Sequence, residues 1–225
     1  MLLTFFQEPT PLQTEKTLSL VELIQNGGLG GQLIIGLLFL LLMVVTYIYF
    51  ERLFAIRAAV KVTPNFMPQI RSFVMNGKLE GAQQLCIQEN IPVSRLIAKG
   101  LSRIGRPLED INTAIENAGR LEVYQLEKNI SVLATIAGAA PMLGFLGTVI
   151  GMILSIFEIS NAGGNIDMQL LADGLYTAMT TTVAGLIVGI VGYISYNHLV
   201  VKINKAVYQM ESSSLEFLDL LNEPA

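Results

Sequence analysis

The sequence has little charge and few of the side chains that carry enzymatic chemistry. Only 14% of its 225 residues are charged, whereas a soluble domain carries about 25%. A single cysteine, Cys86, excludes an internal disulfide and any paired-thiol metal or redox site. The single histidine, His198, belongs to no cluster with metal-ligand spacing, and no nucleophilic Ser–His pair or phosphate-binding loop is present. We therefore predict no catalytic residue, no metal, no cofactor and no enzymatic activity.

Basic segments are also missing. The formal net charge is −4, and Lys and Arg never form a dense block, so we expect no nucleic-acid partner. The first residues lack both the basic region and the apolar core of a signal peptide, so we expect no cleaved leader.

The chain has instead three long stretches without a charged residue. They cover residues 23–50, 129–157 and 174–201. Each is longer than the ~20 residues of helix that cross a bilayer core, and a helix satisfies its own backbone hydrogen bonds in lipid. These lengths disfavour the alternative, a soluble helical bundle. We predict an all-α integral membrane protein with transmembrane helices over residues 31–50, 128–158 and 170–200.

Lys and Arg are concentrated on one side of these spans. Eleven of the 14 lie between residues 52 and 128, two follow the third span, and none lies between the second and third spans. Because positive residues near span ends favour the cytoplasm, we predict that residues 51–127 and the C-terminal helix over 201–225 are cytoplasmic. The N-terminus and a short hairpin over 159–169 are then periplasmic.

Apolar spacing predicts further helices outside the spans. We expect residues 1–30 to form a periplasmic tail that ends in an amphipathic helix at the membrane interface. Within the cytoplasmic region, apolar residues three and four apart predict short helices over 79–90 and 93–104. From Pro107 the helical pattern continues without a breaker through Lys128 into the second span, which predicts one helix from Pro107 to Phe157, about 76 Å long. We expect this helix and the third one to be very long and to pack together in the cytoplasm.

Small residues and threonines recur on one face of the second and third spans. They are Gly144, Thr148, Gly151 and Ser155 on the second, and Ala178, Thr182, Gly185, Gly189 and Gly192 on the third, with Thr177, Thr180 and Thr181 around the latter. The simpler interpretation is close helix packing, because small residues let helix backbones approach in lipid. The functional interpretation is that part of this stripe lines a polar route or receives another helix. Two such faces exceed the needs of one contact, so we expect oligomerisation.

Pro141 and the acidic residues bear on whether the chain moves ions. Pro141 removes a helical hydrogen bond inside the second span, and such a break is tolerated where protein or water covers it. Glu158 and Asp173 flank the outer ends of the spans, and no carboxylate lies at mid-membrane. A chain that moved protons alone would carry an intramembrane acid or base. Either a partner supplies the titrating group, or Asp173 serves at the mouth of a route; a merely solvated Asp173 is the simpler alternative.

Three segments resemble the proton-channel family of MotA, TolQ and ExbB. They are Glu51-Arg52-Leu53 after the first span, the motif APMLGFLGTVIGM over 140–152, and the motif TTTVAGL over 180–186 followed by Tyr196-Asn197. The length and the three spans are more similar to ExbB or TolQ than to the longer, four-span MotA. Thr177 departs from the pattern, because many members have a glutamate at this position.

This resemblance implies a subunit of a bacterial inner-membrane motor, most like ExbB. It implies a homopentamer around the single helices of two ExbD- or TolR-like subunits. Proton-motive force, acting through an aspartate of that partner, would drive a TonB- or TolA-like protein and energise outer-membrane transport. The alternatives are a TolQ-like subunit for envelope integrity, a gliding-type motor, and a non-conducting membrane scaffold.

The resemblance assigns a role to Thr148 and Thr182, and the residue pattern assigns the other roles. Thr148 and Thr182 are expected to line the lumen, with Thr181, Ser155 and Asp173 along the proton pathway. The residues expected to serve helix packing or the kink are Pro141, Gly144, Gly147, Gly151, Ala178, Gly185 and Gly189.

Overall fold

A computed structural model describes residues 29–60, 64–161 and 168–222, with only the backbone described for residues 29, 168–170 and 173. Every regular element in these ranges is a helix. The predicted interfacial helix before residue 30 and most of the 159–169 hairpin lie outside the described residues.

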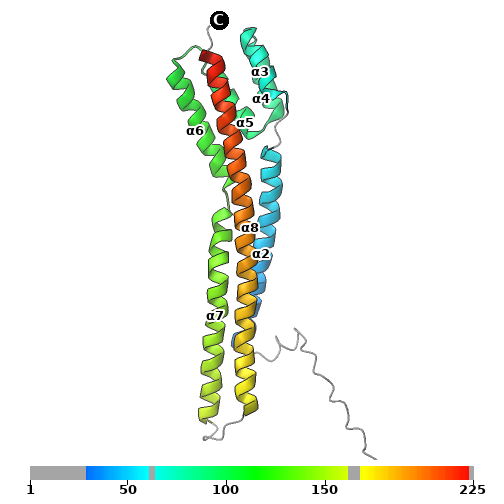
Figure 1. Ribbon diagram of the computed structural model, residues 1–225, viewed down its shortest axis with the longest axis vertical. Coiled ribbons are helices and arrows are strands. Elements are labelled where there is room, and N and C mark those ends of the chain that lie inside the picture. Colours follow the sequence, from blue (N-terminus) through cyan, green and yellow to red (C-terminus); the bar gives the residue numbers. More distant parts are fainter. Residues whose placement is uncertain (1–28, 61–63, 162–167, 223–225) are drawn as a thin grey trace, which may run out of the picture.

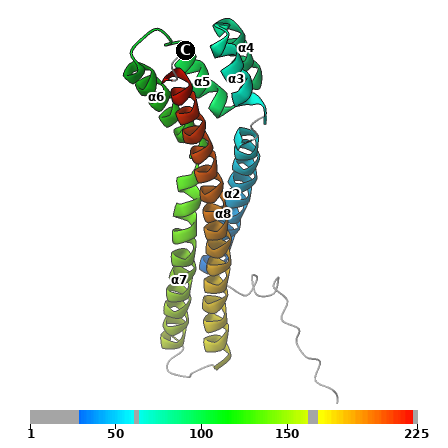
Figure 2. The same cartoon turned by 45° about the horizontal axis from the view of Figure 1, so that its top comes forward.

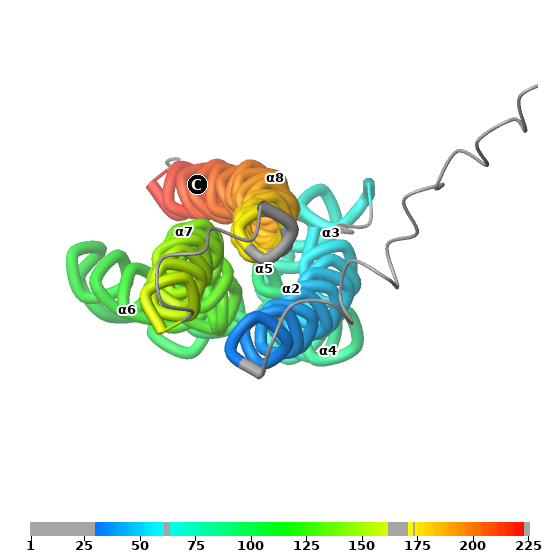
Figure 3. The backbone as a smooth tube through the Cα atoms, turned by 90° about the horizontal axis from the view of Figure 1, so that it is seen from below, coloured from blue at the N-terminus to red at the C-terminus, as the bar shows by residue number. Residues whose placement is uncertain are grey.

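Three long helices lie side by side along the molecule (Figures 1 and 3). They are α2 (Leu29–Val60), α7 (Ile130–Asn161) and α8 (Met168–Asn222). Each is long and apolar enough to cross a membrane, which confirms the prediction of three spans. α2 and α8 run in the same direction and α7 runs in the opposite one (Figure 1). The most extensive contact in the described chain joins α7 to α8.

Four shorter helices surround the C-terminal end of α8. They are α3 (Phe66–Met75), α4 (Leu79–Glu89), α5 (Pro92–Leu101) and α6 (Leu108–Leu126). α6 lies on one side of α8, and α3 and α4 lie on the other (Figure 2). Phe66, Ile97 and Phe217 are fully buried in the core of this end. The predicted short helices over 79–90 and 93–104 are confirmed as α4 and α5.

The predicted single helix from Pro107 to Phe157 is wrong. α6 ends at Leu126 and α7 begins at Ile130, and Asn129 between them has a positive φ of 63°. Asparagine adopts this left-handed conformation more readily than most residues, so no Gly or Pro was needed to end the helix. The Arg52 side chain of α2 donates a hydrogen bond of 3.2 Å to the carbonyl of Gln125. That bond satisfies one of the carbonyls that a helix end leaves without a partner.

α8, by contrast, is unbroken over 55 residues, as the sequence predicts for the third helix. It therefore belongs both to the membrane-spanning part and to the domain formed with α3–α6. Ile203 and Met210 on its second half are buried as expected, whereas Leu215 remains 62% exposed. Packing between α8 and α6 is consequently looser than the sequence predicts.

Candidate functional site

The contact between α7 and α8 brings helix backbones together. A Cβ atom on Gly144 would lie 2.8 Å from the Thr181 carbonyl oxygen and 3.1 Å from Cα of Gly185. A Cβ on Gly185 would lie 2.6 Å from the carbonyl oxygen of Ala140. Real side chains essentially never approach this closely, so glycine is required on both helices. This is the packing that membrane helices use where small residues face each other.

The two small-residue faces are therefore the two sides of one contact. Gly151 lies against Ala178, and Gly192 lies against Ala137. Our expectation that two such faces exceed the needs of a single contact was wrong, because a close approach of backbones requires small residues on both partners. The stripe by itself carries no information about oligomerisation.

Pro141 does not interrupt α7, which stays helical from Ile130 to Asn161. Its ring lies against Gly189, where an added Cβ would be 2.6 Å from the proline Cγ. The Ala137 carbonyl, which has no helical donor because Pro141 lacks an N–H, would lie 3.1 Å from the same Cβ. Of the two covers that the sequence left open, protein or water, the structure shows protein, because Gly189 of α8 lies against the break.

Three threonine hydroxyls gather around the carbonyl oxygen of Gly144. The Oγ1 atoms of Thr148, Thr181 and Thr182 lie within hydrogen-bonding distance of this oxygen, at 3.3, 3.3 and 3.2 Å. The Thr148 and Thr182 hydroxyls are also hydrogen-bonded to each other. The structure thereby joins residues that lie 34 positions apart in the sequence, and whose proximity the sequence implied only through the family resemblance.

The three hydroxyls differ in exposure. Thr181 is fully buried, and the nearest acceptor of its one hydroxyl proton is the Ala178 carbonyl at 2.8 Å. Thr148 and Thr182 are half-buried at the edge of the contact. Each hydroxyl has one proton and two acceptor lone pairs, so this pair can accept a hydrogen bond from a group outside the chain. Of the three, only Thr148 and Thr182 combine that capacity with access from the surface.

Ser155 and Asp173 complete the set of residues expected along a polar route. Ser155 is buried, donates to the Gly151 carbonyl over 2.9 Å, and occupies the space beside Gly174 where a Cβ would stand. It lies seven residues from Thr148 on α7, about 10 Å along the axis. Asp173 belongs to α8, but its side chain is outside the described part of the structure.

Sequence reasoning missed two contacts between α2 and α8. The Tyr49 hydroxyl and Nδ1 of His198 are hydrogen-bonded at 2.8 Å. Near the other end of α2, a Cβ on Gly31 would lie 2.9 Å from Cγ2 of Thr177. Thr177 therefore has its methyl group against α2. Nothing in the sequence spacing indicates these pairs, since they depend on the register between two helices.

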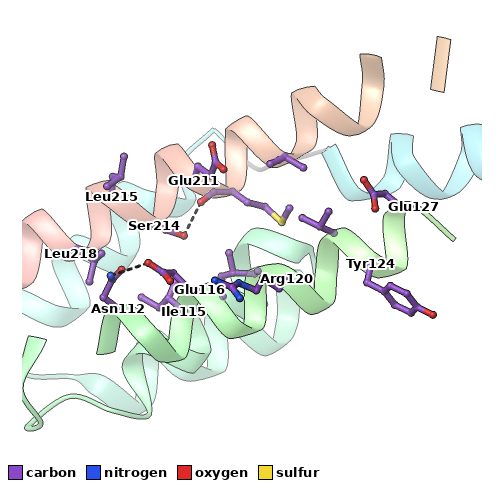
Figure 4. Close-up of a pocket in the computed structure, with 15 residues that line it drawn as sticks. Asn112, Ile115, Glu116, Arg120, Tyr124, Glu127, Glu211, Ser214, Leu215 and Leu218 are labelled. Carbon is purple, nitrogen blue, oxygen red and sulfur yellow. Dashed lines mark hydrogen bonds between the residues drawn. The ribbon is translucent and has the colours of Figure 1, made fainter. Parts of the chain in front are cut away.

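Sequence reasoning also missed a groove between α6 and the C-terminal end of α8. The groove has a volume of about 720 Å³. Asn112, Ile115, Glu116 and Arg120 of α6 line it opposite Glu211, Ser214 and Leu215 of α8 (Figure 4). Tyr124 at its border is 76% exposed. In the described ranges, no group of three or more His, Cys, Asp or Glu side chains has a metal-binding arrangement.

Comparison with known proteins shows the family of the chain. Residues 88–212 match the MotA/TolQ/ExbB proton channel family. The chain is 27% identical over 198 residues to a biopolymer transport protein ExbB homolog of Methanothermobacter thermautotrophicus, covering 86% of this chain and 67% of the relative. It is 36% identical over 112 residues to the biopolymer transport protein ExbB of Aquifex aeolicus, covering 48% and 74% of the two chains. It is also 30% identical over 112 residues to the Tol-Pal system protein TolQ of Haemophilus influenzae, covering 50% and 49%.

The fold and the threonine site are those of a helical membrane protein with an intramembrane polar contact. The chain belongs to the MotA/TolQ/ExbB proton channel family, whose matched region includes both α7 and the greater part of α8. It is a membrane subunit of an energy-transducing system, and this family is not a class of enzymes.

Proposed function

We propose that this chain is an ExbB-like subunit of an inner-membrane motor driven by proton-motive force. The observation that carries the proposal is the hydroxyl pair of Thr148 and Thr182, half-buried at the edge of a contact that glycines hold rigidly. Neither uncharged stretch around these threonines contains a carboxylate. The site can accept and donate hydrogen bonds but does not itself release a proton at neutral pH.

The titrating group then comes from a partner. In this proposal two ExbD- or TolR-like subunits each place an aspartate beside the Thr148–Thr182 pair. The hydroxyls donate to that carboxyl group when it is ionised and accept from it when it is protonated. Both protonation states are thus stabilised inside the membrane, where an unpaired charge is costly. A TonB- or TolA-like protein carries the resulting movement to outer-membrane transport.

Assembly into a homopentamer around the partner helices is part of the same proposal. Leu121, Tyr124 and Leu215 are 65, 76 and 62% exposed on α6 and the end of α8. These helices lie beyond the apolar spans, where lipid does not cover such residues. In the proposed assembly, neighbouring copies cover these exposed apolar side chains.

The proposed orientation follows the distribution of positive charge. The start of α2 and the α7–α8 connection face the periplasm, and α3–α6 with the C-terminus face the cytoplasm. Asp173, one residue before Gly174 in α8, then stands near the periplasmic mouth. We keep it as the proposed entry group of the proton pathway, with Ser155 as a packing residue beside it.

Valine replacements test the threonine pair. Thr148→Val and Thr182→Val keep the side-chain shape and remove the hydroxyls, so we expect an intact complex with energised uptake reduced at least ~10-fold. Thr135→Val is the matched control, because Thr135 lies on the same helix, is exposed, and only bonds back to Ser131 over 2.9 Å. Normal uptake in both variants, with normal assembly, would instead support a non-conducting scaffold.

Two further measurements separate the remaining alternatives. Native mass spectrometry of the gently extracted complex should give five copies of this chain, and a monomer or dimer would contradict the motor. Because one relative is a TolQ, a TolQ-like or gliding-type motor is the second candidate. A deletion strain that loses siderophore uptake supports the ExbB-like role, and one that loses only envelope integrity supports the TolQ-like role.

A further inference from the structure

A small cleft with three cationic side chains lies between α2 and α8. Its volume is about 200 Å³, and its lining consists of Ile56, Arg57 and Val60 from α2 with Lys202 and Lys205 from α8. Ile56 is 1% exposed and Val60 is half-buried, so the floor is apolar. Arg57 and Lys205 are exposed at the rim. The cleft thus combines an apolar floor with a positively charged opening.

No protein carboxylate neutralises these cations in the described part of the chain. The Arg52–Glu51 and Arg95–Glu122 salt bridges both lie outside the cleft. Glu51, the one acidic residue of α2, is therefore already paired with Arg52. Three like charges around one cleft repel each other, and a bound anion would remove this repulsion.

The position of the cleft indicates that the anion belongs to the lipid headgroup layer. Phe50 and Phe54 lie seven and three residues before Arg57, on the same face of α2, and are 50 and 64% exposed. Arg57 therefore ends an exposed aromatic stripe, about 10 Å beyond Phe50 along the helix axis. Lys and Arg at such positions extend their charged ends to the headgroup layer. The bond between Tyr49 and His198 fixes α2 against α8 just before the cleft.

We propose that this cleft binds the phosphodiester headgroup of an anionic phospholipid, with its acyl chains along the Phe50–Phe54 stripe. Basic pockets between transmembrane helices on the cytoplasmic side recognise such headgroups. A volume of about 200 Å³ is below the range of ~300–1,000 Å³ for whole small-molecule sites, which fits a headgroup. Phosphate from solution has the same charge chemistry, but it would leave the adjoining aromatic stripe unused. The inference depends on the membrane location and not on the proposed proton pathway.

Retention of phosphatidylglycerol tests this site. The full chain is placed in nanodiscs of equal parts phosphatidylglycerol and phosphatidylcholine, and the lipid that stays bound is counted by native mass spectrometry. We expect the triple variant Arg57→Gln, Lys202→Gln, Lys205→Gln to lower phosphatidylglycerol retention at least ~10-fold, with phosphatidylcholine unchanged. Lys205→Gln alone, at an exposed position, should lower it ~5-fold, so the test survives if the triple variant fails to fold.

A matched control separates this cleft from general surface charge. Lys78→Gln, Lys99→Gln, Arg106→Gln removes one Arg and two Lys at positions outside the cleft. We expect this control to retain phosphatidylglycerol like the unmodified chain. Equal loss in the control, or undiminished retention in the Lys205→Gln and triple variants, would overturn the proposal. Displacement of the lipid by millimolar inorganic phosphate would overturn its lipid part and assign the cleft to a soluble anion.

Discussion

The two halves of α8 pack in different ways. In its first half, Gly185 meets the backbone of α7 so closely that an added Cβ would lie 2.6 Å from the Ala140 carbonyl oxygen. In its second half, α8 faces α6 across a groove of about 720 Å³ lined by long side chains. α8 therefore makes two kinds of contact. Its first half packs backbone against backbone on α7, and its second half meets α6 through the ends of side chains.

The difference follows from the surroundings of each half. Lipid tails are as apolar as leucine, so helices in the membrane gain stability from close van der Waals contact and interhelical hydrogen bonds. In water, removing large apolar side chains from solvent supplies the driving force, so the contact can be made by long side chains. Gly100 shows the second case, since the atoms nearest to a Cβ there would be the side-chain ends of Phe217 and Ile115.

The largest expected effect is that of Gly185→Ala. The new methyl group would collide with the backbone of α7, which cannot move aside without separating the helices. We expect a loss of more than ~3 kcal/mol in unfolding free energy, beyond the usual ~1–3 kcal/mol of overpacking. Thermal unfolding in detergent measures it.

Gly100→Ala and Gly138→Ala are its controls. Side-chain ends give way at Gly100, so we expect a smaller loss of ~1–3 kcal/mol. A Cβ at Gly138 would meet no atom within 4 Å in the described part of the chain, and alanine there should stabilise α7 by up to ~1 kcal/mol. Equal losses of stability at Gly185 and Gly100 would show that the two halves of α8 do not differ in how tightly they are packed.

An intermediate effect is expected for Glu122→Gln in the α5–α6 contact. Glu122 binds Arg95 through two hydrogen bonds of 2.7 and 2.6 Å, and its side chain is 11% exposed. The same bonds raise the pKa of Arg95. The amide keeps one acceptor oxygen and loses the charge, so we expect a cost of ~1–3 kcal/mol. Chemical unfolding should show this loss of stability, while energised uptake, which we assign to Thr148 and Thr182, stays unchanged. An unchanged unfolding midpoint would contradict a stabilising role for the Glu122–Arg95 pair.

The smallest expected effect is at the break between the two packing modes. Asn129 has a φ of 63°, so Asn129→Ala should cost about 1 kcal/mol, and Asn129→Gly should cost nothing or stabilise. Comparing the melting temperatures of the two variants measures this. If alanine stabilises the protein, α6 and α7 form the continuous helix that the sequence pattern predicts.

Most of the fold follows from the sequence because it depends on long, simple patterns. Three uncharged stretches predict α2, α7 and α8, and local apolar spacing predicts α4 and α5. The break at Asn129 was missed, since an asparagine within a helical pattern is usually helical. The carbonyl of Gln125 receives its donor from Arg52 of another helix, a contact that no local pattern contains.

The candidate site was predictable in its residues and not in its geometry. The stripe and the family motifs select the threonines, but Thr181 and Thr182, adjacent in sequence, differ in exposure. About 100° of helix rotation separates neighbouring residues, which buries Thr181 fully and leaves Thr182 at the edge.

The sequence by itself determined that this protein spans a membrane three times, belongs to a proton-channel family and carries no mid-membrane acid of its own. The length of the uncharged stretches and the family motifs can be read from the sequence without knowing how the helices pack. The tertiary structure decided that the two small-residue faces meet each other, that Thr148 and Thr182 share a hydrogen bond, and that three cations surround one cleft between α2 and α8. Those features depend on the register and rotation of helices far apart in sequence, which only packing fixes.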